Sequence, residues 1–144
     1  MLYSGRSCAR HAPGTHHGSR RTLLANVARD LLRGAVDFHI HTAPDLFPRK
    51  MDDLGLAGAA RDAGMAAIVL KCHHMLTADR ARMAQRLCPE VHVFGGLALT
   101  VPSCGGLNPD AVKVATPMGG KIIWLPTISA LNHLKGVKKK VARN

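Results

Sequence analysis

The feature that most restricts the fold of this chain is an alternation of short apolar runs with segments of helical periodicity. Four runs of strand length cover residues 35–40, 65–70, 91–99 and 121–125. They follow one another at intervals of about 25 to 30 residues, a spacing that suits strands joined by crossover helices. The sequence therefore predicts an α/β domain with a parallel sheet and about four βα units.

Helix-end signals lie between the predicted strands. Asp52-Asp53 can cap a helix that runs to Ala63 and closes at Gly64, Thr77 can cap a second helix, and Asn108 followed by Pro109 can open a third. The second helix is predicted to share one face among Ala81, Ala84 and Leu87. The glycine pairs 95–96 and 105–106 indicate close backbone approach and tight turns.

The chain is too short for four such units to form a closed barrel by themselves. A closed eight-stranded barrel needs about 250 residues, and this chain has 144. The sequence therefore holds material for about half of such a barrel. Half a barrel would leave open sheet edges, so we expect oligomers or aggregation.

The net charge of +11 is concentrated at the two ends of the chain. Residues 1–34 hold six arginines against Asp30 as the only acid, and residues 135–144 hold five basic residues and no acid. We therefore divide the chain into a basic extension over 1–33, the α/β domain over 34–134 and a basic tail over 135–144. Such ends are usually solvated, with binding to polyanions as the minority interpretation.

The basic extension is expected to be disordered over residues 1–20 and then to form a short helix that ends at Gly34. The apolar residues at helical spacing in this segment are Leu23, Leu24, Val27, Leu31 and Leu32. Its arginine-rich, acid-poor composition also resembles a mitochondrial transit peptide, and a start site upstream of the domain would look the same.

Composition disfavours several classes of protein. Aromatic residues make up 3% of the chain, which argues against a nucleic-acid binder built on stacking platforms. No apolar run is long enough to span a membrane, and no secretory signal opens the sequence. The four cysteines lack any C-x-x-C spacing, so we expect reduced thiols and a cytoplasmic location.

The sequence Asp37-x-His39-x-His41 lies at the carboxyl end of the first predicted strand. Residues two apart on a strand point to the same face, so both imidazoles can reach one metal ion. Asp37 shares that face, where its carboxylate could accept a hydrogen bond from a ligating histidine. We predict that His39 and His41 are metal ligands. The alternative is a pair of surface histidines.

The sequence Lys71-Cys72-His73-His74 follows the second predicted strand in the equivalent position. At least one of His73 and His74 is predicted to bind the same metal, although a solvated turn is the alternative. Lys71 is a candidate catalytic residue that could neutralise substrate or metal-bound charge, or it could extend into water. Cys72 is out of phase and is expected to point away from the site.

The proline-rich loop over residues 42–50 contributes two further charged residues. Asp45 is a candidate catalytic residue that could act on metal-bound water, and Arg49 could hold an anionic group of the substrate. The more favoured interpretation of both is a solvated loop charge. Trp124 could form the wall of a substrate pocket, or it could belong to the core. His133 lies beyond the fourth strand, and its sequence position does not place it.

The run Gly34–Asp45 resembles the first motif of PHP-type phosphoesterases and of the wider amidohydrolase superfamily. The residues around Ala63-Gly64-Met65 and Leu70–His74, with several later motifs, more particularly resemble an uncharacterised amidohydrolase-like family that is known only as a domain of unknown function. The later motifs are Phe94-Gly95-Gly96, Gly105–Pro109 and Trp124–Thr127. The likeness covers roughly 100 residues, and several motifs in the same order are more specific than one His-x-His pair.

This resemblance implies the N-terminal half of a distorted TIM-like (β/α) barrel. It also implies one or more divalent metals, with zinc expected and manganese or iron as alternatives, and hydrolysis of a small molecule by metal-activated water. By position, His39 and His41 would be the first ligands and His73 or His74 the next. The family's remaining ligands come from later strands, so the sequence resembles a truncated product, a fragment or one segment of a split protein. The alternatives are a non-catalytic metal-binding remnant and, less favoured, a basic protein that associates with nucleic acid.

Overall fold

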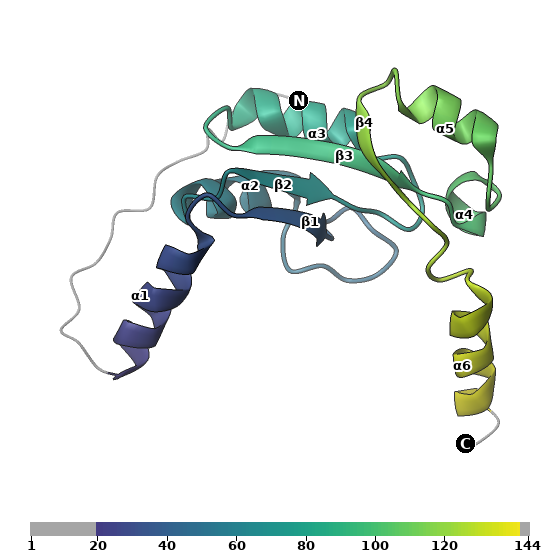
Figure 1. Cartoon of the computed structure of the whole chain (residues 1–144), viewed down its shortest axis with the longest axis horizontal. Coiled ribbons are helices and arrows are strands. Elements are labelled where there is room, and N and C mark those ends of the chain that lie inside the picture. The colour runs from purple at the N-terminus through teal and green to yellow at the C-terminus, as the bar shows by residue number, and fades with distance from the viewer. Residues whose placement is uncertain (1–19, 142–144) are drawn as a thin grey trace, which may run out of the picture.

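A four-stranded parallel sheet forms the centre of the computed structural model, which describes residues 20–141 (Figure 1). The strands are β1 (Val36–Ile40), β2 (Ala67–Leu70), β3 (His92–Ala98) and β4 (Gly120–Trp124), and their order in the sheet is β1-β2-β3-β4. This arrangement confirms the predicted α/β class and all four predicted strands. Most of the segment 1–20, for which disorder is expected, lies outside the described residues.

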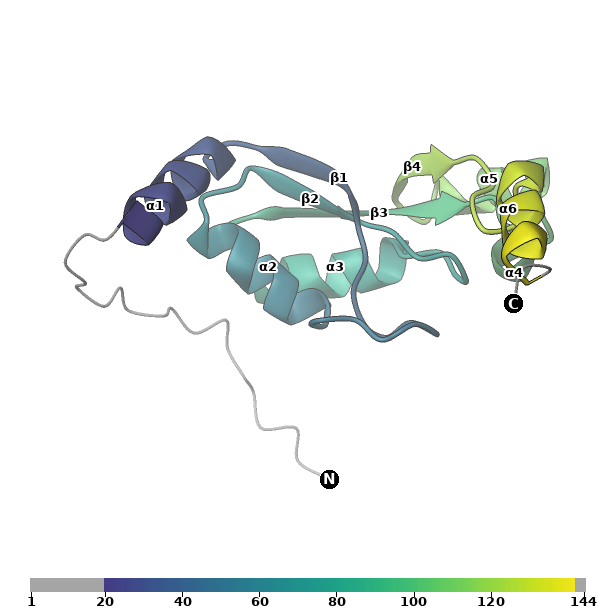
Figure 2. The same cartoon turned by 90° about the horizontal axis from the view of Figure 1, so that it is seen from below.

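Helices follow or precede each strand. They are α1 (Arg20–Leu32), α2 (Asp53–Asp62), α3 (Ala78–Leu87), α4 (Val101–Cys104), α5 (Pro109–Ala115) and α6 (Leu131–Val141). Figure 2 shows α2 and α3 side by side against one face of the sheet. By contrast, α1 and α6 extend away from the sheet at opposite ends of the molecule (Figure 1). The sequence did not predict α4 or α6, and α6 crosses the expected boundary between the domain and the basic tail.

The main core lies between β1–β3 and the helices α2 and α3. Its buried residues are Leu56, Ala57, Ala60, Ile68, Leu70, Ala81, Ala84, Cys88, Val91 and Val93. Small side chains on both helices let them approach the sheet and each other closely. The predicted face of α3 is correct for its alanines and wrong for Leu87, which is 54% exposed. Leu87 is the last residue of the helix.

Two of the predicted helix caps form as the sequence indicates. The Asp52 carboxylate accepts a hydrogen bond from the Gly55 amide, and the Asn108 side chain accepts from the amides of Asp110 and Ala111. These bonds satisfy backbone donors that have no partner inside the first turn of a helix. After α2 the chain turns at Gly64 with a φ of 71°, a conformation that glycine adopts at little cost.

Thr77 precedes α3 as predicted, but its hydroxyl does not cap the helix. It donates to the Leu70 carbonyl at 2.6 Å and lies 2.9 Å from the Gly96 amide, which donates to it. The hydroxyl therefore joins the ends of β2 and β3. A Cβ at Gly95 would collide with the Thr77 backbone, and one at Gly96 would collide with the Ile122 carbonyl and the Trp124 ring. Close approach, as predicted, explains this glycine pair.

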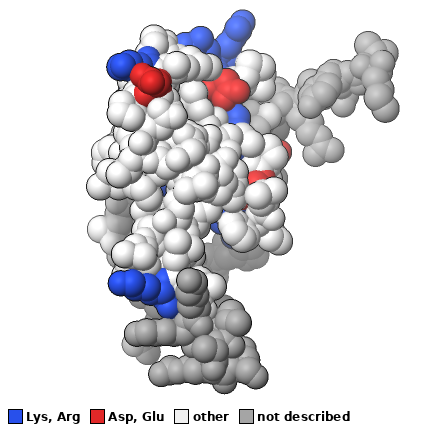
Figure 3. Space-filling view, turned by 90° about the vertical axis from the view of Figure 1, so that its right-hand side faces the viewer, with Lys and Arg blue, Asp and Glu red and all other residues white. Residues whose placement is uncertain are grey.

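The outer strands leave apolar side chains uncovered. Phe38 on β1 is 61% exposed, and Leu125 just after β4 is 72% exposed. In the view of Figure 3, most of the surface atoms that are described belong to neither acidic nor basic residues. Among residues 20–141, no helix has the length and apolar character needed to cross a membrane.

Candidate metal centre

The carboxyl ends of β1 and β2 bring three histidines together. The Nε2 atoms of His39 and His41 are 3.2 Å apart, and the ring centroids of His41 and His73 are 4.7 Å apart. Ile40, which lies between the first two histidines, instead packs against the main core. The histidines therefore occupy the face of the sheet opposite α2 and α3, at the edge where parallel α/β proteins place their sites.

The sheet curls around this group of histidines. The His39 ring on β1 lies 6.5 Å from the Trp124 ring on β4, and the Lys71 ammonium lies 5.1 Å over the Trp124 ring. In a flat sheet, the backbones of the first and fourth strands would be about 14 Å apart. Side chains from the two outer strands can meet because the sheet is concave on this side.

His73 is held by two threonines from later in the chain. The Thr127 hydroxyl lies 2.9 Å from His73 Nδ1, and the Thr100 hydroxyl donates to the His73 carbonyl at 2.6 Å. If Nδ1 carries the proton and donates it to Thr127, Nε2 keeps a free lone pair. Metal-binding histidines commonly use such a second hydrogen bond to fix their ring. The sequence did not identify either threonine, because neither belongs to a recognisable metal motif.

His74 points to a different part of the site. Its Nε2 lies 3.5 Å from the Asp45 carboxylate, and its ring lies 5.7 Å from that of Phe47. Neither ring nitrogen of His74 has a hydrogen-bond partner in the described structure, and both are buried. Of the two histidines that the sequence left open, His73 therefore lies with His39 and His41, while His74 lies beside Asp45.

Asp45 is not the solvated loop charge that the sequence favoured. Its side chain is completely buried and forms an ion pair of 2.7 Å with Arg49. Burial tends to raise the pKa of Asp45, but hydrogen bonds from Arg49 and the Phe47 amide outweigh burial and lower it. Arg49 is thus engaged by a carboxylate of its own chain. Asp45 also lies 4.0 Å from His41 Nδ1.

A second ion pair, which the sequence did not predict, fixes the loop over residues 42–50. Arg80 on α3 binds the Asp53 carboxylate at 2.8 Å and also donates to the carbonyls of Ala43 and Pro44. The Thr42 hydroxyl donates to Asp53 and accepts from Arg80. Burial opposes the charge of Arg80, but the hydrogen bond and charge of Asp53 outweigh burial and raise its pKa. The loop that carries Asp45 is therefore held by Asp53 of α2 and Arg80 of α3.

The structure also places four other side chains that the sequence singled out. Asp37 accepts a hydrogen bond from the His39 backbone amide at 2.8 Å instead of one from an imidazole. Lys71 does not extend into water, since it is only 2% exposed. His133 is exposed on α6. Cys72 is buried, in agreement with its expected direction away from the site.

The environment of the cluster favours neutral imidazoles. Burial, followed by the charge of Arg49, lowers the pKa of His41 to about 4. Burial and the nearby Lys71 lower the pKa of both His39 and His73. Burial also lowers the pKa of Lys71. Histidine binds metals in its neutral form, so the site is prepared for this role at neutral pH.

The donor atoms fit a divalent ion in part. Two nitrogens bound to one tetrahedral zinc at about 2.0–2.1 Å lie about 3.3 Å apart, and the separation between His39 and His41 is 3.2 Å. The same distance also suits a hydrogen bond between the rings. Within residues 20–141, no group of three or more His, Cys, Asp or Glu side chains is arranged to hold an ion. The pair is therefore in position, and a third ligand would require a side-chain movement.

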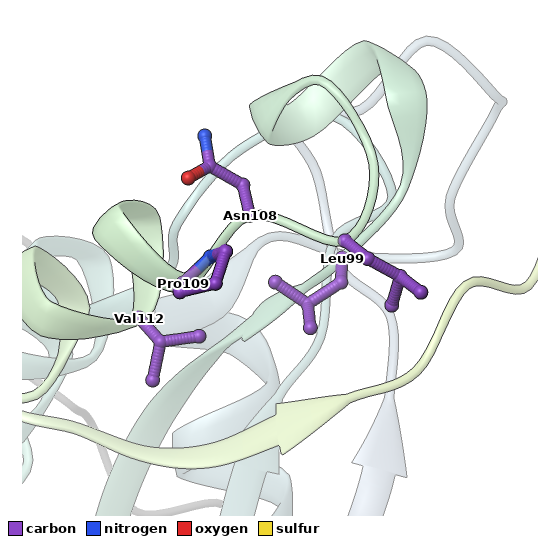
Figure 4. Close-up of a pocket in the computed structure, with 5 residues that line it drawn as sticks. Leu99, Asn108, Pro109 and Val112 are labelled. Carbon is purple, nitrogen blue, oxygen red and sulfur yellow. The ribbon is translucent and has the colours of Figure 1, made fainter.

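The described hollows on the surface lie away from the histidines. One, of about 380 Å³, is lined by Leu99, Leu107, Asn108, Pro109 and Val112, where the end of β3 meets α5 (Figure 4). Its lining contains no titratable side chain that could take part in acid–base chemistry. The candidate site is therefore the concave face where His39, His41 and His73 converge.

Comparison with known proteins gives one match. The model of the family of unknown function DUF6282 matches residues 34–144. No curated protein and no solved structure is significantly similar to the chain. The matched region begins at the glycine before β1 and includes every residue of the candidate site.

Proposed function

Because the chain belongs to DUF6282, a family of unknown function, we propose a function from the site itself: metal-dependent hydrolysis of a small molecule, of the amidohydrolase type. The observation that carries this proposal is the convergence of His39 and His41, whose Nε2 atoms are 3.2 Å apart. Neutral imidazoles at this separation are suited to one divalent ion, with zinc expected and manganese or iron as alternatives.

Each residue of the site has a role in this proposal. His39 and His41 hold the ion, and His73 is the next ligand, with its ring fixed by Thr127 at 2.9 Å. Asp45 lies beside His41 and His74 and is a weak proton acceptor, because Arg49 keeps its carboxylate ionised. When bound, a divalent ion supplies the Lewis acidity that activates water for hydrolysis.

We further propose that the sheet is the first half of a TIM-like barrel. Three features support this: consecutive strands are neighbours, all pairs are parallel, and α2 and α3 cover the convex face. In an open doubly wound sheet the strand order would reverse at some point. The short distance between His39 and Trp124 also agrees with a sheet that curls toward closure.

Metal analysis of the purified protein tests the proposal. We expect about one divalent ion per chain, lost in His39→Ala and in His41→Ala. The matched control is His92→Ala, because His92 is an exposed histidine at the start of β3. Wild-type protein that binds no divalent metal would contradict the proposal, as would equal metal contents in all three variants.

A metal-binding remnant without catalytic activity is the second candidate. The absence, within the described residues, of a group of three or more metal-binding side chains arranged to hold an ion favours it. A panel of simple amides, carboxylic esters and phosphate esters distinguishes the two candidates. Metal-dependent turnover that is lost in His41→Ala supports the hydrolase. Stoichiometric metal without turnover of any of these substrates supports the remnant.

A further inference from the structure

Lys71 is a buried cation that lacks a counter-charge in the described structure. Its side chain is 2% exposed, and within residues 20–141 no carboxylate pairs with it. The ammonium lies over the face of the Trp124 ring, 5.1 Å from the ring centroid. A buried charge without a partner is costly, and a negatively charged ligand bound beside it would offset that cost.

Neither of the two carboxylates beside the histidines pairs with Lys71. Asp45 is bound by Arg49 at 2.7 Å, and Asp37 accepts the His39 amide at 2.8 Å. The other groups near the ammonium are the imidazoles of the candidate metal centre, which bring no negative charge. The Lys71 ammonium therefore has no paired carboxylate among the described residues.

Trp124 gives this position an apolar wall. The ring on β4 has the Lys71 ammonium over its face, and a Cβ at Gly96 would collide with it. Gly96 thus leaves room for the indole. A molecule that enters here meets one cationic group and one large apolar surface.

We propose that Lys71 and Trp124 form a subsite for one carboxylate group on an otherwise apolar small molecule. A carboxylate fits better than a phosphate, because phosphate sites typically use arginine forks or several backbone amides. Arg49, which lies near His41 and His73, is taken by Asp45. The inference rests on the proposed function for the reaction at the neighbouring histidines, and it names the substrate class as small carboxylates.

Binding to the metal-free protein tests the subsite, with Trp124 as the probe because it is the single tryptophan of the chain. Butanoate, butanamide and butyl phosphate are titrated in the presence of a chelator at constant ionic strength. We expect a saturable fluorescence change with butanoate, and affinities weaker by about tenfold or more for the other two ligands. Lys71→Met should weaken butanoate binding by a similar factor.

Lys121→Met is the matched control, because Lys121 lies on β4, three residues before Trp124, and is exposed. It should bind butanoate like the wild type. The proposal is overturned by wild-type protein that does not respond to butanoate, or by equal binding in Lys71→Met. Equal binding of butanamide, or tighter binding of butyl phosphate, would overturn it too.

Thermal unfolding provides a second readout that does not depend on fluorescence. Butanoate should raise the Tm of the wild type and of Lys121→Met but leave that of Lys71→Met unchanged. Equal increases in all three proteins would contradict the subsite. Because a chelator is present throughout, these results do not depend on metal binding. A protein that binds no metal can therefore still confirm the subsite. Bound metal without a response to butanoate would remove the subsite alone.

Discussion

The carboxylate of Asp45 shows how a charged loop residue becomes part of a site. It is completely buried, is paired with Arg49 at 2.7 Å and lies 3.5 Å from His74. A buried ion pair often contributes little net stability, but removal of one partner leaves an uncompensated charge. Asp45 and Arg49 should therefore behave as a unit.

Arg49→Met is expected to lower the free energy of unfolding by about 3 kcal/mol, because it strands the buried Asp45 charge. The double variant Asp45→Asn/Arg49→Met should lose much less than the sum of the two single variants. Urea unfolding of the four proteins measures this coupling. As a control, Lys113→Met removes an exposed pair with Asp110 and should have almost no effect. If the decreases in the free energy of unfolding from the two single variants simply add in the double variant, Asp45 and Arg49 are not coupled.

The pH dependence of stability should report His41. Its pKa in the folded protein is lowered to about 4 from the ordinary 6.5, so between these values the unfolded chain binds more protons. Stability is then fully present above the higher value and is lost as the pH falls toward the lower one. The loss amounts to at most about 3 kcal/mol.

Urea unfolding in the presence of a chelator, repeated at several pH values, measures this slope. His41→Gln should reduce it, and the exposed His92→Gln should not. An unchanged slope in His41→Gln would show that the ring is not held neutral as the structure indicates.

Among the elements, β3 contains two glycines, Gly95 and Gly96, at which a side chain would clash with its neighbours. Gly96→Ala is expected to lower the free energy of unfolding by about 2–3 kcal/mol, because its Cβ would meet the Ile122 carbonyl and the Trp124 ring. Gly136→Ala is the control, since nothing lies within 4 Å of a Cβ at that position in α6. Circular dichroism melts compare the two variants. Equal midpoints would show that β4 moves away freely.

For the molecule as a whole, the two outer strands present unpaired edges. β1 and β4 each pair on one side only in the described sheet, and Phe38 is 61% exposed next to the open edge of β1. Unpaired strand edges invite pairing with another chain. Two copies that join β1 of one chain to β4 of the other would pair the open edges and give eight parallel strands.

We therefore expect the purified chain to self-associate, with a dimer as the smallest stable form. Light scattering after size-exclusion chromatography measures the mass. Phe38→Lys should weaken association because it places a charge beside the edge of β1. Leu46→Lys should not, since Leu46 is an exposed loop residue. A wild-type monomer at high concentration would contradict this expectation.

Much of the fold could be predicted from local patterns. The positions of Asp52, Gly64 and Asn108 gave helix ends that the structure confirms, and four apolar runs gave four strands. The prediction failed where tertiary contacts override local preference. The Thr77 hydroxyl joins two strands instead of capping its helix.

The alternation of strands and helices and the shared face of His39 and His41 could be predicted from the sequence. Strand periodicity places these two histidines on one face whatever surrounds them. The environment of each charge does not follow from it. Burial of Asp45, its pairing with Arg49 and the contact of Lys71 with Trp124 depend on a loop and a curved sheet that join residues far apart in the chain. Periodicity is a property of neighbours along the chain, whereas burial and charge pairing arise only when distant segments pack together.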